Sequence, residues 1–122
     1  MAIKVLIVED DPTMLTLLQT FLQFEGFEVA IHDQLQAMDQ VMRKIRSEKP
    51  DVVIMDVYMG ALNGFDLLAG IRMDPEIKDV GIIMSSGADF DGRSRAEGAN
   101  SFILKPYMPE ELVRSIYRVV AG

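Results

Sequence analysis

Charged and polar side chains end several apolar runs of this sequence, at places where their chemistry can be used. The run of residues 52–55 leads directly into Asp56, and burying a lone carboxylate beside such a run is costly unless it has a function. Similar junctions, in chain order, are formed by Glu9 and Asp10, by Ser86 and by Lys105. We therefore predict that Asp56 is a nucleophile and that these four other residues assist it.

The residue types at these junctions are suited to the transfer of a phosphoryl group. The carboxyl ends of parallel strands meet at one edge of a sheet, so the carboxylates of Glu9, Asp10 and Asp56 would crowd together. Crowded carboxylates repel one another, and Mg²⁺ relieves this because it takes a few carboxylate oxygens and keeps several waters. The ammonium group of Lys105 and the hydroxyl of Ser86 can hold phosphoryl oxygens. Asp56 would then attack phosphorus and form an acyl phosphate.

These junctions need a parallel sheet, and the order of the expected elements supplies one. Apolar runs alternate with helical patterns five times, and the expected strands are residues 3–8, 27–31, 52–56, 82–84 and 102–104. Four helices are expected: one starts after Asp11, one covers residues 35–45, one starts after Asn63, and one starts at Pro109. Between the fourth and fifth strands, residues 89–100 form the least regular segment. The alternation predicts an α/β fold, a doubly wound, five-stranded parallel sheet with helices on both faces.

The totals of the sequence limit the classes of function. With 122 residues, of which 49% are hydrophobic and 25% charged, we expect one domain covering residues 1–122. A net charge of −7 argues against direct nucleic-acid binding, which needs a basic surface. The sequence has no cysteine, no apolar run long enough to span a membrane, and no signal-peptide pattern before residue 3. We therefore expect a cytoplasmic protein that has no disulfides and does not associate with membranes.

Five short motifs occur in order, each at an expected strand end or helix start. They are Val8-Glu9-Asp10, Met55-Asp56, Asn63-Gly64, Met84-Ser85-Ser86-Gly87, and Gly98-Ala99 followed by Leu104-Lys105-Pro106. Each motif is weak alone, but together they make the chain resemble the response-regulator receiver domains of two-component signalling, the CheY-like family, over essentially all 122 residues. The resemblance implies the flavodoxin-like strand order 2-1-3-4-5.

The resemblance also assigns roles in metal binding. It implies that Asp56 is the phosphoacceptor and a ligand of Mg²⁺, which Mn²⁺ can replace. Asp10 should be a direct ligand, and Glu9 should act through a water molecule. The main-chain carbonyl of Tyr58 should be a third protein ligand.

A second set of implied roles concerns the switch. Ser86 should move its hydroxyl onto the phosphate, and the aromatic side chain of Phe102 should follow that movement. Lys105 should contact the phosphoryl group, with a cis peptide bond to Pro106. Ser85 is the rival to Ser86, and we interpret it as a packing residue because the small Gly87 follows Ser86 rather than Ser85.

Three functions are compatible with these residues. The resemblance implies a phosphorylation-controlled switch that receives its phosphoryl group from a sensor histidine kinase or phosphotransfer protein, loses it slowly by its own catalysis, and controls a downstream protein or output domain. A magnesium-dependent phosphatase is the second, but that class has a second aspartate two residues after the nucleophile, where this chain has Tyr58. The third is a degenerate receiver used only for binding, and the complete set of site residues argues against it.

The chain departs from the family pattern in three places. Gly60 stands where proline is usual, which predicts a looser loop. The segment before Lys105 is about one helical turn, ~3.6 residues, short, so residues 89–100 are expected to be mobile and the output surface unusual. Met108 is a poor residue to cap the helix that starts at Pro109.

Overall fold

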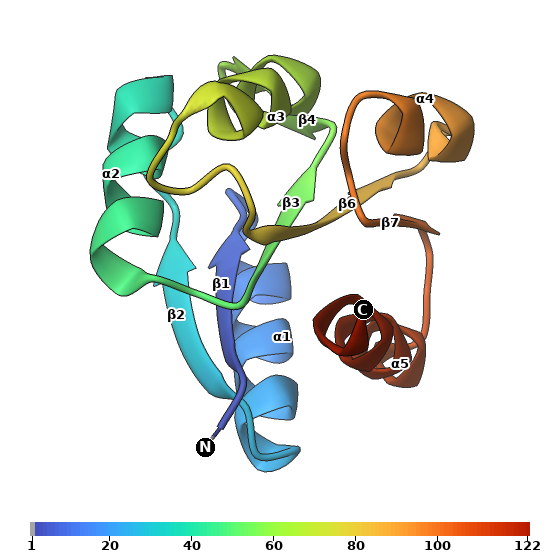
Figure 1. Cartoon of the computed structure of the whole chain (residues 1–122). Coiled ribbons are helices and arrows are strands. Elements are labelled where there is room, and N and C mark those ends of the chain that lie inside the picture. The colour runs from blue at the N-terminus through green and yellow to red at the C-terminus, as the bar shows by residue number, and fades with distance from the viewer. Residues whose placement is uncertain (1) are drawn as a thin grey trace.

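A computed structural model describes residues 2–122 and shows a central sheet covered by helices on both faces (Figure 1). The elements in chain order are β1 Lys4–Val8, α1 Pro12–Phe24, β2 Glu28–His32, α2 Met38–Glu48, β3 Val52–Asp56, β4 Tyr58–Met59, β5 Leu62–Asn63, α3 Gly64–Met73, β6 Gly81–Ser86, α4 Asp91–Ala96, β7 Ser101–Leu104 and α5 Pro109–Ala121.

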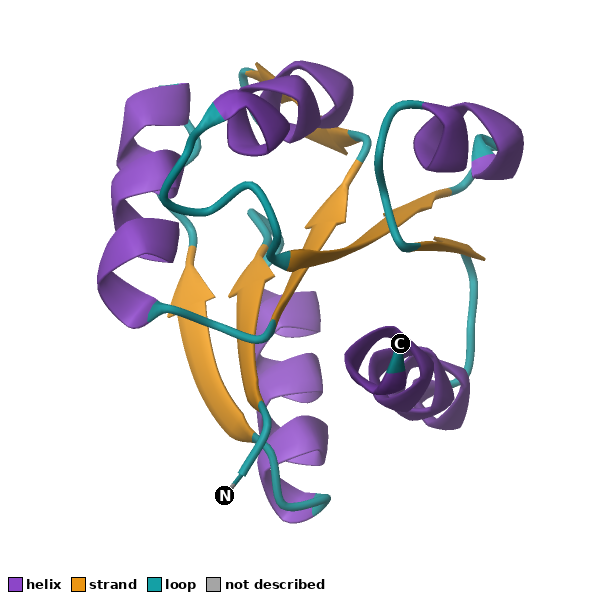
Figure 2. Ribbon diagram, viewed as in Figure 1, coloured by secondary structure: helices purple, strands orange, loops and turns teal. Residues whose placement is uncertain are grey.

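The five long strands form one parallel sheet in the order β2-β1-β3-β6-β7. Counted by these five strands alone, this is the order 2-1-3-4-5, so the predicted α/β fold is confirmed. Strands β4 and β5 form a separate antiparallel pair that the sequence did not predict, visible as two short orange arrows in Figure 2. Helices α1 and α5 lie on one face of the sheet, and α2, α3 and α4 lie on the other (Figure 1).

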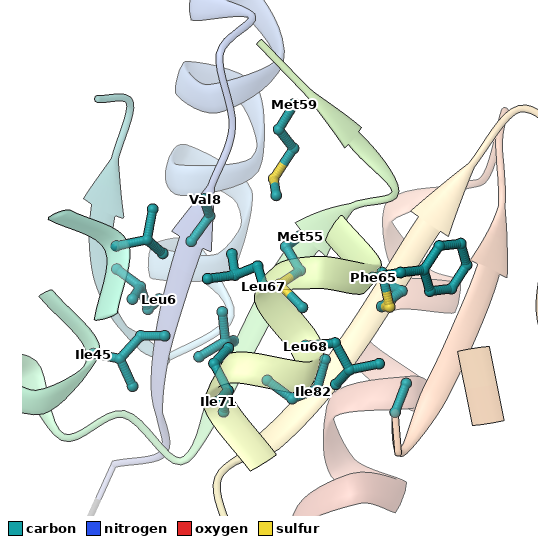
Figure 3. Close-up of a cluster of buried hydrophobic side chains, with 14 of the residues drawn as sticks. Leu6, Val8, Ile45, Met55, Met59, Phe65, Leu67, Leu68, Ile71 and Ile82 are labelled. Atoms are coloured by element: carbon teal, nitrogen blue, oxygen red, sulfur yellow. The ribbon is translucent and has the colours of Figure 1, made fainter. Parts of the chain in front are cut away.

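The central strands are apolar throughout because each contributes to two cores. In β1, Leu6 and Val8 join the cluster under α2 and α3, whereas Val5 and Ile7 join the cluster under α1 and α5. Figure 3 shows the first cluster, in which side chains from β1 and β3 meet those of α3. Alternate residues of a strand face opposite sides, so a strand covered on both faces reads as a continuous apolar run. Strand β2 is less buried, as predicted for an edge.

Two expected helix starts are confirmed by their caps. Asp11 Oδ1 accepts hydrogen bonds from the N–H groups of Thr13 and Met14 at the start of α1. Asn63 Oδ1 accepts in the same way from the N–H groups of residues 65 and 66 at the start of α3. At α5, Met108 has no capping oxygen, and the side chain of Glu111 instead accepts from its N–H, 3.3 Å away.

One helix differs from the expectation at its start. The sequence predicts a helix over residues 35–45, but α2 starts at Met38 and runs to Glu48. Leu35 matches the helical spacing and is buried, yet it reaches the core from an extended loop. A loop residue that fills the same core as a helix cannot be separated from that helix by spacing alone.

The segment 89–100 is short, as expected, but it has specific anchors. Helix α4 has six residues, and Ser94 on it is fully buried. Arg72 of α3 donates from Nε to the carbonyl of Gly98 and from Nη2 to Asn100 Oδ1, both at 2.9 Å. The guanidinium group of Arg93 lies 3.9 Å from the centre of the Phe65 ring. These contacts explain how so short a helix holds its place on the sheet.

Candidate functional site

The site lies at the carboxyl edge of the sheet, where Asp56 is the last residue of β3. Met55 directly before it is fully buried, and the Asp56 side chain is 14% exposed, so its carboxylate lies between the core and the surface. Gly64 packs against this point: a side-chain carbon there would collide with the main-chain carbonyl oxygen of Asp56. The glycine that follows Asn63 therefore lets α3 start close to Asp56.

Both oxygens of the Asp56 carboxylate have partners. Lys105 Nζ lies 2.9 Å from Oδ2, and the Ser85 hydroxyl donates to Oδ1 at 2.6 Å. Burial lowers the pKa of Lys105, but the hydrogen bond to Asp56 and the carboxylates of Asp56, Glu9 and Asp10 outweigh it and raise the pKa above 10.5. Lys105 is therefore a permanent positive charge beside Asp56.

Glu9 is a nearly buried acid in the same cluster, 5% exposed. Its Oε2 accepts from the N–H groups of Asp10 at 3.0 Å and Asp11 at 3.2 Å. Burial, and next the negative charge of Asp56, raise the pKa of Glu9 to about 7, although the Asp11 N–H and Lys105 work in the opposite direction. The charge of Asp56 therefore disfavours the charged form of Glu9, as the crowding of strand ends predicts.

Asp10 is exposed and faces the loop after β3. Its Oδ2 accepts from the N–H of Gly60 at 2.9 Å. Gly60 has a φ of +54°, a left-handed conformation that glycine adopts without strain, which accounts for glycine where the family usually has proline. Tyr58 begins β4 two residues after Asp56 and is 66% exposed. Within residues 2–122, no three acidic, histidine or cysteine side chains are arranged around a common metal position.

The structure places the two serines differently from the sequence-based expectation. Ser85, interpreted as a packing residue, is the one in contact with Asp56. Ser86 Oγ accepts from the N–H of Ala88 at 3.2 Å. The signal that could have identified Ser85 is register: Asp56 pairs with Ser85 across β3 and β6, and paired residues on neighbouring strands point to the same face.

The remaining predicted residues lie on or after β7. Phe102 pairs with Met84 and packs against the core cluster under α2 and α3. The Lys105–Pro106 peptide bond is cis, as expected. Tyr107, which the sequence did not single out, is half-buried; burial, followed by the charges of Asp56 and Glu9, raises its pKa to about 12.

Comparison with known proteins decides the family. A sequence profile described as response regulator receiver domain matches residues 5–117. The chain belongs to this family. The receiver domain is 31% identical to the protein PilH of Pseudomonas aeruginosa over 122 residues, which cover 98% of each chain. It is 28% identical to the DNA-binding response regulator MtrA of Mycolicibacterium smegmatis, of which it spans about half, 48%.

Solved structures agree with this assignment. A putative response regulator from Chloroflexus aurantiacus superposes with a TM-score of 0.88 at 28% identity, covering all of both chains. The chemotaxis response regulator CheY4 of Vibrio cholerae superposes with a TM-score of 0.85 at 28% identity, over 98% of this chain and 99% of CheY4. As a receiver domain, the chain is a phosphorylation-dependent switch of two-component signalling. Within residues 2–122, no helix has the length and apolar character needed to cross a membrane.

Proposed function

We propose that this receiver domain accepts a phosphoryl group on Asp56 from a sensor histidine kinase or phosphotransfer protein and then controls a downstream protein or output domain. The observation that carries the proposal is the environment of Asp56. Its carboxylate ends the central strand, Lys105 Nζ contacts one oxygen at 2.9 Å, and Ser85 Oγ contacts the other at 2.6 Å. A carboxylate held in this way at a partly open edge is a positioned nucleophile.

In the transfer, a carboxylate oxygen of Asp56 donates an electron pair to phosphorus. The bond between phosphorus and the donor breaks in line, and its electron pair leaves with the donor, which is an imidazole nitrogen when the donor is phosphohistidine. Lys105 begins beside the attacking carboxylate, 30% exposed, and its ammonium group can follow the charge onto the phosphoryl oxygens. The chain thus catalyses its own modification and has no separate substrate to turn over.

The acids around Asp56 fit Mg²⁺ by their chemistry, with Mn²⁺ as its substitute. Glu9, Asp10 and Asp56 offer the hard oxygen ligands that Mg²⁺ prefers. Burial raises the pKa of Glu9 first, and the negative charge of Asp56 raises it next; a bound cation would relieve this second contribution. Asp10 and Asp56, with the main-chain carbonyl of Tyr58, would hold the ion, and Glu9 would act through water. When bound, the ion would supply positive charge to the phosphoryl oxygens. The hydrogen bond from Gly60 to Asp10 Oδ2 competes with metal binding for that oxygen.

We also propose that Ser86 and Phe102 carry the signal away from the site. Ser86 ends β6, and its hydroxyl accepts from the N–H of Ala88, a contact that is lost if the hydroxyl turns to a phosphoryl group. Phe102 lies on the neighbouring strand and packs against the cluster that Phe90, just before α4, also joins. If the Ser86 side chain rotates toward a phosphoryl group, we expect Phe102 and Phe90 to repack beside α4. In this proposal α4 is the element with two arrangements that a switch requires.

The experiment that tests the proposal is phosphorylation by a small donor. Incubated with acetyl phosphate and Mg²⁺, the protein should gain one phosphoryl group in intact mass spectrometry, and the Asp56→Asn variant should gain none. Labelling of Asp56→Asn at the wild-type rate would place the acceptor elsewhere. Continued release of phosphate from phosphate monoesters, with many turnovers per protein molecule, would instead support the phosphatase alternative.

A further inference from the structure

The contact between Ser85 and Asp56 divides the two carboxylate oxygens into different environments. Ser85 is 2% exposed and pairs directly with Asp56 across the sheet, so its hydroxyl reaches Oδ1 from the interior. The distance of 2.6 Å lies in the range of hydrogen bonds between a hydroxyl and a charged oxygen. Lys105, which is 30% exposed, contacts Oδ2.

This division indicates which oxygen carries the phosphoryl group. A phosphoryl group needs space and positive charge, and Lys105 supplies the charge beside Oδ2. Oδ1 is held on the buried side by Ser85. The new bond therefore forms at Oδ2, and Oδ1 becomes the carbonyl oxygen of the acyl phosphate, still within reach of the Ser85 hydroxyl.

We propose that Ser85 is a catalytic residue that shortens the lifetime of the phosphorylated state; this rests on the proposed function, with Asp56 as acceptor. In the loss of phosphate, a water oxygen attacks phosphorus, the bond between phosphorus and Oδ2 breaks, and its electron pair returns to the Asp56 carboxylate. The proton of the water leaves with the phosphate product or to solvent. Negative charge thus develops on the carboxylate, which shares it between Oδ2 and Oδ1.

The Ser85 hydroxyl acts on that developing charge. A hydrogen bond to a charged oxygen is roughly twice as strong as one to a neutral carbonyl, so the bond from Ser85 strengthens as the acyl phosphate breaks down. An interaction that is stronger in the transition state than in the ground state accelerates the step. In the forward transfer the carboxylate keeps much of its charge in a loose transition state, so the hydrogen bond from Ser85 changes less in strength there than in the decay.

The test compares decay with loading in variants of Ser85. Ser85→Ala removes the donor, and Ser85→Cys keeps the approximate side-chain size with a much weaker donor. After acetyl phosphate is removed, both variants should lose the phosphoryl group about fivefold more slowly than wild type, equivalent to about 1 kcal/mol at 1.36 kcal/mol per tenfold. Their loading rates should fall by a smaller factor than their decay rates, because the carboxylate already carries its charge before loading. Agreement of the two variants separates the hydroxyl from a packing effect.

Ser115→Ala is the matched control. Ser115 is another buried serine whose hydroxyl donates to a side chain, Ser101 Oγ at 2.8 Å, and it lies on α5 outside the site. This variant should decay and load like wild type. A second readout is independent of phosphorylation: the carbon-13 shift of the Asp56 carboxyl group should change in Ser85→Ala and remain unchanged in Ser115→Ala.

The possible failures are distinct. If wild type is labelled at Asp56 but Ser85→Ala decays at the wild-type rate, the role of Ser85 is wrong and the proposed function stands. Faster decay in Ser85→Ala, or slow decay in Ser85→Ala but not in Ser85→Cys, overturns the role equally. If wild type gains no phosphoryl group at all, both the proposed function and the role of Ser85 fall.

Discussion

The carboxylate of Glu9 lies 3.9 Å from the ammonium group of Lys105, too far for a hydrogen bond, although Glu9 is almost fully buried. Lys105 is closer to Asp56, at 2.9 Å, so its single positive charge is shared between the carboxylates of Asp56 and Glu9. Burial, and next the charge of Asp56, raise the pKa of Glu9 to about 7, and the distant Lys105 compensates its charge only in part. An ionised Glu9 therefore costs the folded protein stability.

This arrangement predicts how the stability of the metal-free protein depends on pH. The pKa of Glu9 is raised from 4.5 to about 7, so its favourable contribution is complete below pH 4.5 and is lost as pH rises through 7. Between pH 5 and pH 8, the free energy of unfolding should fall by at most about 3 kcal/mol from this group. Chemical denaturation in a chelator should show the fall, and Glu9→Gln should remove most of it. An equal fall in Glu9→Gln would assign the pH dependence to other groups.

Magnesium should stabilise the same site. A cation that binds the folded state relieves the repulsion among the acids, so the melting temperature should rise with Mg²⁺ concentration by mass action. Asp10→Asn should lose most of this rise, because it removes the charge of the carboxylate that we propose as a ligand, which is exposed at the edge of the sheet. Asp51→Asn is a useful control, since Asp51 accepts from the N–H of Lys4 at 2.8 Å, just before β3 rather than at its carboxyl end. If Asp10→Asn responds to Mg²⁺ as strongly as wild type, Asp10 is not a ligand.

The fold could be predicted from the sequence because its strongest signals are local. A few neighbouring residues are enough to predict the strands β1 and β3 from their apolar runs. The same holds for the helix starts at the caps Asp11 and Asn63. The sequence predicts the start of α2 three residues too early, because Leu35 fills the same core from a loop. The pair β4 and β5 was missed because strands of two residues have no periodic pattern.

The site could be predicted as a set of residues but not as a set of contacts. Glu9, Asp56 and Lys105 gather because parallel strands bring their carboxyl ends together. The choice between Ser85 and Ser86 depends on the register between β3 and β6, which pairs residues from distant parts of the chain. The contact between Asp10 and Gly60 depends on one left-handed residue. Side-chain hydrogen bonds of this kind join residues that are far apart in sequence, so no local pattern reports them.

Residues 89–100 remain the segment that we predict to respond to phosphorylation. Amide hydrogen exchange there should be fast in the free protein and slow down when a phosphate mimic and Mg²⁺ are bound, because a helix of six residues depends on its anchors. Slow exchange in both states, equal to that of the central strands, would indicate a rigid segment.

Arg72 should be the main anchor of this segment. Besides Gly98 and Asn100, it donates to the carbonyls of Lys78 at 2.7 Å and Val80 at 2.6 Å. Arg72→Met removes the side-chain donor to the carbonyls of Gly98, Lys78 and Val80, while Asn100 Oδ1 keeps its hydrogen bond from the N–H of Ile82. The free energy of unfolding should therefore fall by about 1–3 kcal/mol, and exchange in residues 89–100 should accelerate. Arg118→Met, at an exposed position near the end of α5, should change neither quantity. Unchanged exchange in Arg72→Met would show that α4 is held by its apolar contacts instead.

Replacing a glycine by alanine should change the stability of the protein in opposite directions at Gly64 and Gly92. At Gly64, a side-chain carbon would collide with the carbonyl oxygen of Asp56 and crowd the Met84 side chain, so Gly64→Ala must push α3 away from β3. We expect a loss of stability of more than about 2 kcal/mol, together with slower phosphorylation because Asp56 is displaced. Gly92 lies within α4, and a side-chain carbon there meets no atom within 4 Å. Gly92→Ala should therefore stabilise the protein by about 0.5–1 kcal/mol through helix propensity. Urea denaturation of both variants measures the two effects, and a tolerated Gly64→Ala with unchanged phosphorylation would show that the start of α3 does not position Asp56.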